Sequence, residues 1–377
     1  MTFEILRENF AKALLTCNKA ISVKASLPIL QNILIEEDSK RIKLTATDLD
    51  KSVMCFVGAK ITGENTPVTI PAKVLASFVA GLQDETITCE IKKEQLEVVS
   101  KNAKAKFNGI SHKEFPTLNY KISDQALLIN TDSLKRAIDE TYFSASLDDT
   151  KPIWTGILLK IVEGSMHVVA LDGFRLSKKL VSLDELSKNK FEKDLQVVIP
   201  AKNLFEVIKL ASREDVIKID IQEDRSVVLF EFGDTLFVSK IIEGEYPNYE
   251  AVIPQNTTVA FSVLNEDLLR ALKLASVFSS ENNAVRLMVK PTESIIKLVS
   301  DSAELGNNEY VINITETSGD DLEIGFNAKN LLDYLNNVSS ERINVKLSGQ
   351  TSPAIFTPQG RSDYIHVTVP LQPYWES

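Results

Sequence analysis

One helical segment occurs three times in this chain of 377 residues. The copies read "IPAKVLASFVAGL" from Ile70, "IPAKNLFEVIKLA" from Ile199 and "FNAKNLLDYLNNV" from Phe326, so they lie 129 and 127 residues apart. Counting from the alanine of each Ala-Lys pair, apolar residues follow at offsets of 3, 6 and 7 in every copy. These offsets place the apolar residues on one face of a helix. The chain is therefore predicted to repeat one structural plan three times.

Other segments recur with nearly the same period. A second helix opens each unit, in "FAKALLTCNKAIS", "LKRAIDETYFSAS" and "LLRALKLASVFSS". Upstream of each Ala-Lys helix lies an aspartate at a matching place, namely Asp48, Asp172 and Asp301 (the repeated aspartates). Downstream, apolar residues alternate with polar ones as in a half-buried strand, at Ile87, Cys89 and Ile91, at Ile217, Ile219 and Ile221, and at Ile343, Val345 and Leu347.

Each unit is about 125 residues long, which is an ordinary domain size. It holds two amphipathic helices and many short strands with one apolar and one polar face. Such strands are typical of antiparallel sheets, so the predicted class is α+β. We place the domains at 1–122, 123–254 and 255–377, with no long Pro, Gly or Ser linker between them.

Motifs of catalysis are missing from the sequence. Neither GxxxxGK[ST] nor GxGxxG occurs, and there is no GxSxG elbow. The three histidines, His112, His167 and His366, lack the spacing of metal ligands. The repeated aspartates fall one to a domain, which favours a turn or cap role over a shared catalytic site. We therefore predict no catalytic residue, no metal, no cofactor and no enzymatic activity.

Three cysteines, Cys17, Cys55 and Cys89, form no CxxC motif, and one would stay unpaired under any disulfide scheme. They are expected to be buried free thiols in a reducing compartment. No apolar run approaches the roughly 18 residues of a membrane span, and the N-terminus lacks the apolar region of a signal peptide. The predicted location is cytoplasmic, without a membrane partner.

The net charge of −10 argues against a protein coated with nucleic acid, but not against a local basic surface. A lysine stands in the first turn of each repeated helix, where a cation opposes the helix dipole. These are Lys73, Lys202 and Lys329, and the opening helices repeat a base at Lys12, Arg136 and Arg270. For any one of these basic residues, the simplest interpretation is a solvated charge on the protein surface. Their repetition favours contact with the phosphates of a polyanion, without sequence preference and weakened by salt.

Several stretches of the chain have a sequence characteristic of one protein family. The characteristic stretches are "SLPILQNILIE" (26–36), "LTATDLD" (44–50), "TIPAKVL" (69–75), "EFPTL" (114–118), "ALDGFRLS" (170–177), "VVIPAKNLFEVIKL" (197–210), "FVSKIIEGEYPNYEAVIP" (237–254), "IGFNAKNLLDYL" (324–335) and "VTVPL" (367–371). On these stretches the chain resembles, over essentially its whole length, the bacterial DNA polymerase III beta subunit, the sliding-clamp family.

This resemblance implies three tandem DNA-clamp domains in a head-to-tail homodimer that closes into a ring lined by twelve helices. Such a ring encircles double-stranded DNA without sequence preference and performs no chemistry. It tethers the replicative polymerase for processive synthesis. The implied protein partners are the DNA polymerase III alpha subunit, the clamp loader and other proteins with a clamp-binding motif.

The resemblance also implies site residues. DNA contacts fall on Lys24, Lys73 and Lys202, to which the repeat adds Lys12, Arg136 and Arg270. Dimer contacts fall on Phe107, Val277 and Phe278, for which a plain core role fits the sequence equally well. A partner-peptide pocket between the second and third domains falls on Trp154, Leu171, Gly173, Phe174, Arg175, Leu176, Pro247, Val252, Val367, Thr368, Val369, Pro370 and Leu371.

The chain departs from the family pattern in this pocket. Phe174 stands where the family often has histidine, Ala251 where it often has arginine, and Trp154 replaces a smaller apolar residue. Beyond "VPL" the chain continues as "QPYWES", and we hypothesise that residues 373–377 compete with partner peptides. A change in peptide affinity on their deletion is the expected result.

Two other functions remain open from the residues. One is a scaffold of three domains that binds only proteins, which would lack salt-dependent DNA binding. The other is an enzyme whose site is assembled across domain junctions, which would show clustered polar groups with strongly shifted pKa values.

Overall fold

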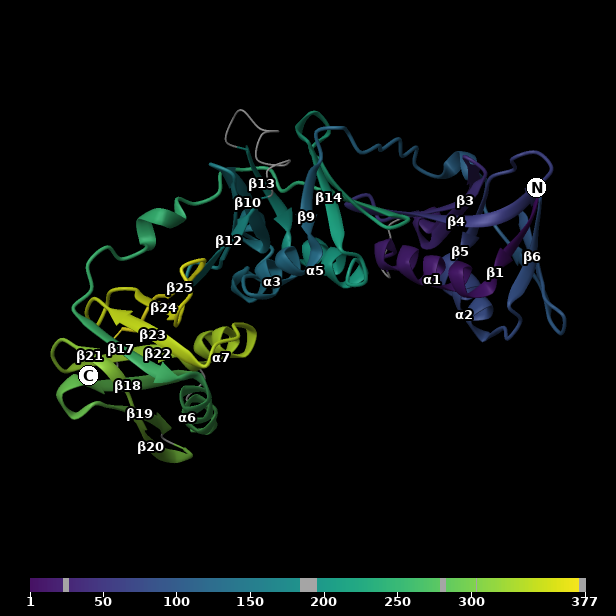
Figure 1. Ribbon diagram of the computed structural model, residues 1–377. Helices are drawn as coiled ribbons and strands as arrows, with labels where there is room; N and C mark the ends of the chain where they lie inside the picture. Colours follow the sequence, from purple (N-terminus) through teal and green to yellow (C-terminus); the bar gives the residue numbers. More distant parts are fainter. Residues whose placement is uncertain (23–26, 184–194, 279–282, 303, 373–377) are drawn as a thin grey trace. The chain divides into compact units, whose positions relative to one another are not determined.

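A computed structural model describes residues 1–22, 27–183, 195–278, 283–302 and 304–372 of the chain (Figure 1). These residues form two compact units. The first unit contains residues 1–132 and 206–241, and the second contains residues 133–205 and 242–377. The middle repeat contributes to both units, and each unit is described by itself.

The described residues contain two helices for each repeat, as predicted. The opening helices are α1 (Arg7–Cys17), α3 (Thr131–Asp139) and α6 (Asn265–Val277). The Ala-Lys helices are α2 (Ala72–Gly81), α5 (Ala201–Leu210) and α7 (Ala328–Asn337). Each Ala-Lys helix follows directly on a strand, so its alanine and lysine are its first two residues.

The first unit contains a twelve-stranded antiparallel sheet whose main path runs β8-β7-β6-β1-β4-β16-β15-β14-β9, with β2, β3 and β5 paired off it. Its strands are β1 (Thr2–Leu6), β2 (Asn32–Asp38), β3 (Arg41–Thr47), β4 (Lys51–Thr62), β5 (Val68–Pro71), β6 (Thr86–Lys92), β7 (Gln95–Val99), β8 (Lys104–Asn108), β9 (Leu127–Asn130), β14 (Val216–Gln222), β15 (Val227–Phe232) and β16 (Thr235–Lys240).

The second unit contains a nine-stranded sheet, β13-β10-β11-β12-β25-β24-β23-β17-β21, and a four-stranded sheet, β20-β19-β18-β22. The strands are β10 (Gly156–Val162), β11 (Ser165–Leu171), β12 (Arg175–Ser182), β13 (Leu195–Pro200), β17 (Val259–Leu264), β18 (Ala284–Lys290), β19 (Ile295–Ser302), β20 (Gly306–Asn313), β21 (Thr315–Ser318), β22 (Leu322–Asn327), β23 (Arg342–Leu347), β24 (Ala354–Pro358) and β25 (Tyr364–Thr368). All strand pairs in both units are antiparallel, as the α+β prediction requires.

Two strand pairs join successive repeats into continuous sheets. In the first unit β4 pairs with β16, in a register that sets Cys55 opposite Thr235. In the second unit β12 pairs with β25, with Leu176 opposite Val367. Backbone hydrogen bonds therefore connect the domains inside each unit, and no separate linker is needed there.

The predicted apolar helix face packs the core. In α7, Ala328, Leu331, Tyr334 and Leu335 are buried, at offsets of 0, 3, 6 and 7. They pack with apolar side chains from α6 and from both sheets of the second unit. Burial of each large side chain stabilises the fold by about 1.5–3 kcal/mol relative to exposure. The first-turn lysine at offset 1 is left on the outside.

Several smaller predictions are also confirmed. Cys17, Cys55 and Cys89 are buried free thiols. Asp48 and Asp172 both accept backbone hydrogen bonds in tight turns, so these two aspartates have the predicted turn role. No helix among the described residues is long and apolar enough to cross a membrane.

Candidate partner-binding surface and nucleic-acid contacts

The predicted partner-pocket residues begin at the hairpin between β11 and β12. Asp172 Oδ1 accepts hydrogen bonds from the backbone N–H groups of Phe174 and Arg175, both at 2.9 Å. Gly173 between them has φ +90°, and a Cβ atom there would lie 2.7 Å from the Trp154 ring. The turn therefore needs aspartate for its hydrogen bonds and glycine for its backbone and its contact with Trp154.

The C-terminal strand lies against this hairpin. Leu176 pairs with Val367 across β12 and β25, and the Val369 N–H donates to the Phe174 carbonyl at 2.8 Å. The Leu371 N–H donates to the Gly325 carbonyl of β22, also at 2.8 Å. Residues 367–371 are thereby held between the hairpin and the four-stranded sheet.

These residues form an apolar surface, which we call the partner surface and define by the thirteen residues that the resemblance implies. Its floor is buried: Leu171, Leu176 and Val367 are 6%, 2% and 2% exposed and belong to one apolar cluster with Trp154 packed against it. Its rim is open: Phe174, Val252 and Val369 are 67%, 49% and 41% exposed. Apolar side chains exposed together in this way are typical of sites that bind other proteins.

Sequence reasoning missed part of this cluster. Tyr249 is buried in it, and Ile242, Tyr246 and Ile253 pack against it from the segment that follows β16. The quoted "GEYPNY" stretch contained both tyrosines, so their presence was visible although their place in the cluster was not.

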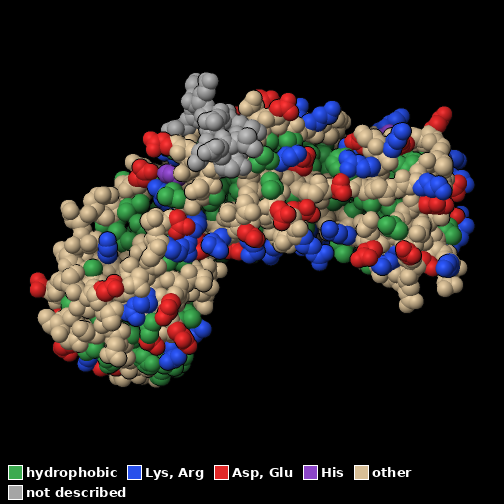
Figure 2. Space-filling view, in the orientation of Figure 1, with side chains coloured by type: hydrophobic (Ala, Val, Ile, Leu, Met, Phe, Trp, Pro, Cys, Tyr) green, Lys and Arg blue, Asp and Glu red, His purple; other side chains and the backbone are tan. Residues whose placement is uncertain are grey.

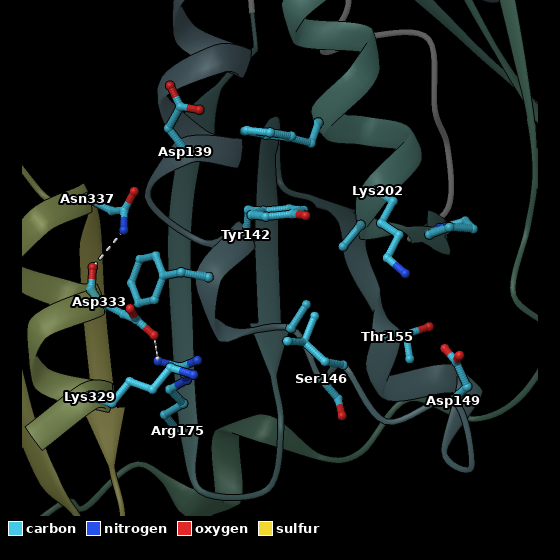
Figure 3. Close-up of a pocket in the computed structure, with 16 residues that line it drawn as sticks. Asp139, Tyr142, Ser146, Asp149, Thr155, Arg175, Lys202, Lys329, Asp333 and Asn337 are labelled. Atoms are coloured by element: carbon cyan, nitrogen blue, oxygen red, sulfur yellow. Dashed lines mark hydrogen bonds and ion pairs between the residues drawn. The ribbon is translucent and has the colours of Figure 1, made fainter. Parts of the chain in front are cut away.

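Arg175 differs from the rest of the partner surface because acids hold its side chain. Its Nε lies 3.0 Å from Asp172 Oδ2 and its Nη1 lies 2.7 Å from Asp333 Oδ2 on α7. The guanidinium is therefore a tie between β12 and α7, and the pairing with Asp333 was not predicted. Arg175 also lines a separate pocket of 520 Å³, shown in Figure 3, which contains none of the other twelve partner-surface residues but does contain the predicted DNA contact Lys202.

The first domain repeats the hairpin but not the apolar floor. Asp48 accepts from the N–H groups of Asp50 and Lys51, at 3.1 and 2.9 Å, just as Asp172 does in its own turn. In the repeat register, however, Thr47 and Ser52 stand where Leu171 and Leu176 stand in the second domain. Both are buried, and their hydroxyls lie 2.8 Å apart. The first repeat therefore has a polar pair where the second has the apolar floor.

The candidate DNA contacts are mostly exposed. Lys12, Lys73, Arg136 and Lys202 are all exposed and form no ion pair within the described residues. In Figure 2, Lys and Arg side chains gather over α3 and α5. Lys24 lies outside the described residues, as do residues 373–377.

Arg270 differs from these four exposed residues. Its guanidinium lies 3.4 Å from Glu266 and 3.8 Å from Asp267 on the same helix, α6. These acids neutralise part of the charge that Arg270 would bring to a phosphate contact.

The candidate dimer contacts lie near two free sheet edges. Phe107 is on β8, the end strand of the twelve-stranded sheet, but it is only 8% exposed and packs edge-on against Phe78 at 5.4 Å. Val277 ends α6 and is 63% exposed, and Phe278 follows it as the C-cap. In the same unit as α6, β20 is the end strand of the four-stranded sheet. Within a single chain, Phe107 is therefore buried and Val277 is exposed.

Comparison with known proteins identifies the family. Residues 1–119, 128–248 and 250–372 match the N-terminal, central and C-terminal domains of the DNA polymerase III beta subunit. The chain belongs to the DNA polymerase III beta subunit family. The sliding-clamp function and the three tandem clamp domains expected from the sequence are thereby confirmed. This family is a non-catalytic processivity factor, which also confirms that the chain is not an enzyme.

Individual proteins of the family match this chain over nearly its full length. The beta sliding clamp of Staphylococcus aureus is 28% identical, and the match covers 99% of this chain and 100% of the relative. The crystal structure of the DNA polymerase sliding clamp from Bacillus subtilis has a TM-score of 0.92 at 28% identity, over 99% of this chain and 100% of that one. The beta subunit from the DNA polymerase of Streptococcus pyogenes has a TM-score of 0.91 at 26% identity, with the same coverage.

Proposed function

We propose that two copies of this chain close head to tail into a ring that encircles duplex DNA in the cytoplasm. In this proposal the DNA polymerase III alpha subunit, the clamp loader and other proteins with a clamp-binding motif dock on the partner surface. The observation that supports it most strongly is the match to all three domains of the clamp family in order. The domain boundaries near residues 122 and 254 are part of the proposal.

Ring closure is supported by two of the end strands of the sheets, β8 and β20. The strands β8 and β20 each have an outer edge whose backbone groups pair with no other strand of the described residues. Such edges attract further strands, and a β8-to-β20 contact between two copies would be heterologous, closing after two subunits. The exposed Val277 supplies apolar area beside this contact.

DNA contact is assigned to Lys24, Lys73 and Lys202, with Lys12 and Arg136 as further contacts and Arg270 as a weak one. The exposed, unpaired lysines carry their full charge to the solvent, which suits contact with phosphates. Because these contacts carry no sequence information, the ring is expected to hold any duplex.

The DNA assignment is tested by the salt dependence of binding. Lys73→Ala with Lys202→Ala should flatten the slope of log K against log salt by about 0.9 for each lost phosphate contact. Lys346→Ala is the matched control, since Lys346 is exposed on β23 and also forms no ion pair within the described residues. An unchanged slope in the double variant would remove both lysines from the assignment.

The partner surface is tested with a peptide that carries a clamp-binding motif. Phe174→Ala removes an exposed side chain of the rim and should weaken binding by about 1–2 kcal/mol without altering the fold. Leu49→Ala is the control, because Leu49 is 43% exposed in the corresponding hairpin of the first domain. Equal losses in both variants would contradict binding at the second-domain hairpin.

A further inference from the structure

The second unit holds a pocket of which only Lys202 and Arg175 belong to the proposed clamp contacts. It has a volume of 520 Å³, within the range of about 300–1,000 Å³ that suits a small molecule. Its walls come from the start of α5, from α7, from the short 3₁₀ turn Tyr142–Ser144 and from the loop after it. Two first-turn lysines, Lys202 and Lys329, line it together.

The cations of this pocket are of two kinds. Arg175 is held by Asp172 and Asp333, so it is not available to a ligand. Lys202 and Lys329 are exposed and form no ion pair within the part of the chain that the structure describes. In Figure 3, Lys202 lies on the side of the pocket opposite to α7, which carries Lys329. A ligand in the pocket would therefore meet a lysine on each of two opposite sides.

The acids of this pocket reduce that charge only in part. Asp333 is paired with Arg175, and Asp139 is paired with Lys135 at 2.5 Å. Asp149 is the remaining lining carboxylate, and it forms no ion pair within the described residues. After these internal pairs the pocket has two available cations against one available anion, which favours an anionic ligand of low charge.

An aromatic ring completes the pocket. Tyr142 stacks on Phe205 with ring centres 4.5 Å apart and an angle of 16° between the planes. In Figure 3 the Tyr142 ring lies across the middle of the pocket, between α7 and Lys202. Because Phe205 occupies one face of this ring, a planar ligand would stack on the other face.

We propose that this pocket binds a nucleotide, with the base stacked on Tyr142 and the phosphate between Lys202 and Lys329. An aromatic platform beside cations is how proteins bind single-stranded nucleic acid without sequence preference. On a DNA clamp, the source of the nucleotide is a single strand that leaves the duplex, and a free nucleotide is the other source of the same chemistry. The choice of a strand rests on the proposed function.

The test is the binding of a short labelled oligothymidylate to the full-length protein, measured by fluorescence anisotropy at several salt concentrations. Tyr142→Leu keeps apolar area but removes the aromatic face, and should weaken binding about five-fold or more. Lys329→Ala should flatten the salt slope by about 0.7, the value for one phosphate contact of a single strand. Asp149→Asn should strengthen binding, because it removes the one unpaired lining carboxylate.

Controls separate this site from the duplex contacts. Lys346→Ala should leave oligothymidylate binding unchanged, and thermal unfolding will show whether Tyr142→Leu is folded. If thymidine monophosphate binds with the same pattern of variant effects, the nucleotide site is supported and a free nucleotide becomes its source. If Lys329→Ala and Asp149→Asn both leave oligothymidylate binding unchanged, the nucleotide site is overturned. Duplex binding that still depends on Lys73 would then leave the clamp proposal intact.

Discussion

Gly173 is the residue on which the shape of the partner surface most depends. Its φ of +90° is rarely adopted by residues with a side chain, and an added Cβ would lie 2.7 Å from the ring of Trp154. Trp154 itself packs on the apolar cluster beneath the surface. A change at Gly173 should therefore shift both the turn and the tryptophan.

We predict that Gly173→Ala lowers the free energy of unfolding by about 1–3 kcal/mol and weakens peptide binding. Gly360→Ala is a matched control, because Gly360 has φ +77° but open space around its Cβ position. The control should show backbone strain alone, about 1–2 kcal/mol, with peptide binding intact. Equal peptide affinity in the two variants, measured by calorimetry, would mean that the Trp154 contact is unimportant.

His366 is a fully buried histidine on β25. Its Nδ1 lies 2.9 Å from the Ser177 hydroxyl, and its ring stacks on Tyr334 at 4.8 Å. Burial, helped by the positive charge of Arg175, lowers the pKa of His366 to about 3. In the unfolded chain a histidine titrates near its usual pKa of about 6.5.

This pKa difference predicts a pH dependence of stability. Below about pH 6.5 the unfolded state binds a proton that the folded state does not, so stability falls as the pH decreases towards 3. The loss from His366 approaches about 1.4 kcal/mol per pH unit in this range. Denaturant titrations at several pH values should show a shallower dependence for His366→Gln than for the wild type. Parallel curves would contradict a neutral, buried His366.

At the scale of elements, the pairing of β12 with β25 is reinforced by an ionic cluster in which Glu140 and Lys179 are buried. Glu140, at the end of α3, is 3% exposed and accepts two hydrogen bonds of 2.7 Å from the Arg361 guanidinium. Lys179 on β12 lies 3.3 Å from the same carboxylate and also pairs with Asp363. The hydrogen bonds that Arg361 donates to the Glu140 carboxylate raise the pKa of the Arg361 guanidinium, which keeps it charged.

Because Glu140 and Lys179 are buried, removal of the Glu140 charge leaves Lys179 with only the partly exposed Asp363 as its partner. Glu140→Ala should lower the unfolding free energy by about 3–5 kcal/mol. The exposed pair of Arg270 and Glu266 provides the control, and Glu266→Ala should cost less than about 1 kcal/mol. The measurement is chemical unfolding of each variant. Similar losses of unfolding free energy in Glu140→Ala and Glu266→Ala would show that the ionic cluster does not stabilise the fold.

Much of this architecture was predictable from local patterns. The offsets of 3, 6 and 7 gave the helices and their buried faces, because a helix repeats every 3.6 residues whatever it packs against. The pairing of β12 with β25 was not predictable in this way, since Leu176 and Val367 meet only through the tertiary fold. The same holds for the contact between Arg175 and Asp333. The pairing of Arg270 with Glu266 was readable from their spacing on one helix and was missed.

At the scale of the whole molecule, the sequence repeats and the compact units do not coincide. The middle repeat, 123–254, contributes residues 123–132 and 206–241 to the first unit and residues 133–205 and 242–254 to the second. Each unit is closed by a sheet that continues from one repeat into the next. Continuous sheets make the domain junctions part of the folded core of each unit, in which β8 of the first unit and β20 of the second are end strands of their sheets.

Dimer formation should respond to a charge placed beside one of these edges. Val277→Asp introduces a carboxylate where an exposed valine ends α6, and should shift the protein from dimer to monomer. Val216→Asp is the control, because Val216 is 47% exposed on β14 in the first unit. Light scattering after gel filtration reports the mass of each variant. A dimeric Val277→Asp protein would place the subunit contact elsewhere.

The most direct test of the clamp account is electron microscopy of the purified protein in negative stain, without DNA. The account predicts closed rings of two chains, with six lobes and a central hole wide enough for duplex DNA. Separate three-lobed particles at micromolar concentration would contradict it, because a chain that does not close cannot hold DNA by encircling it.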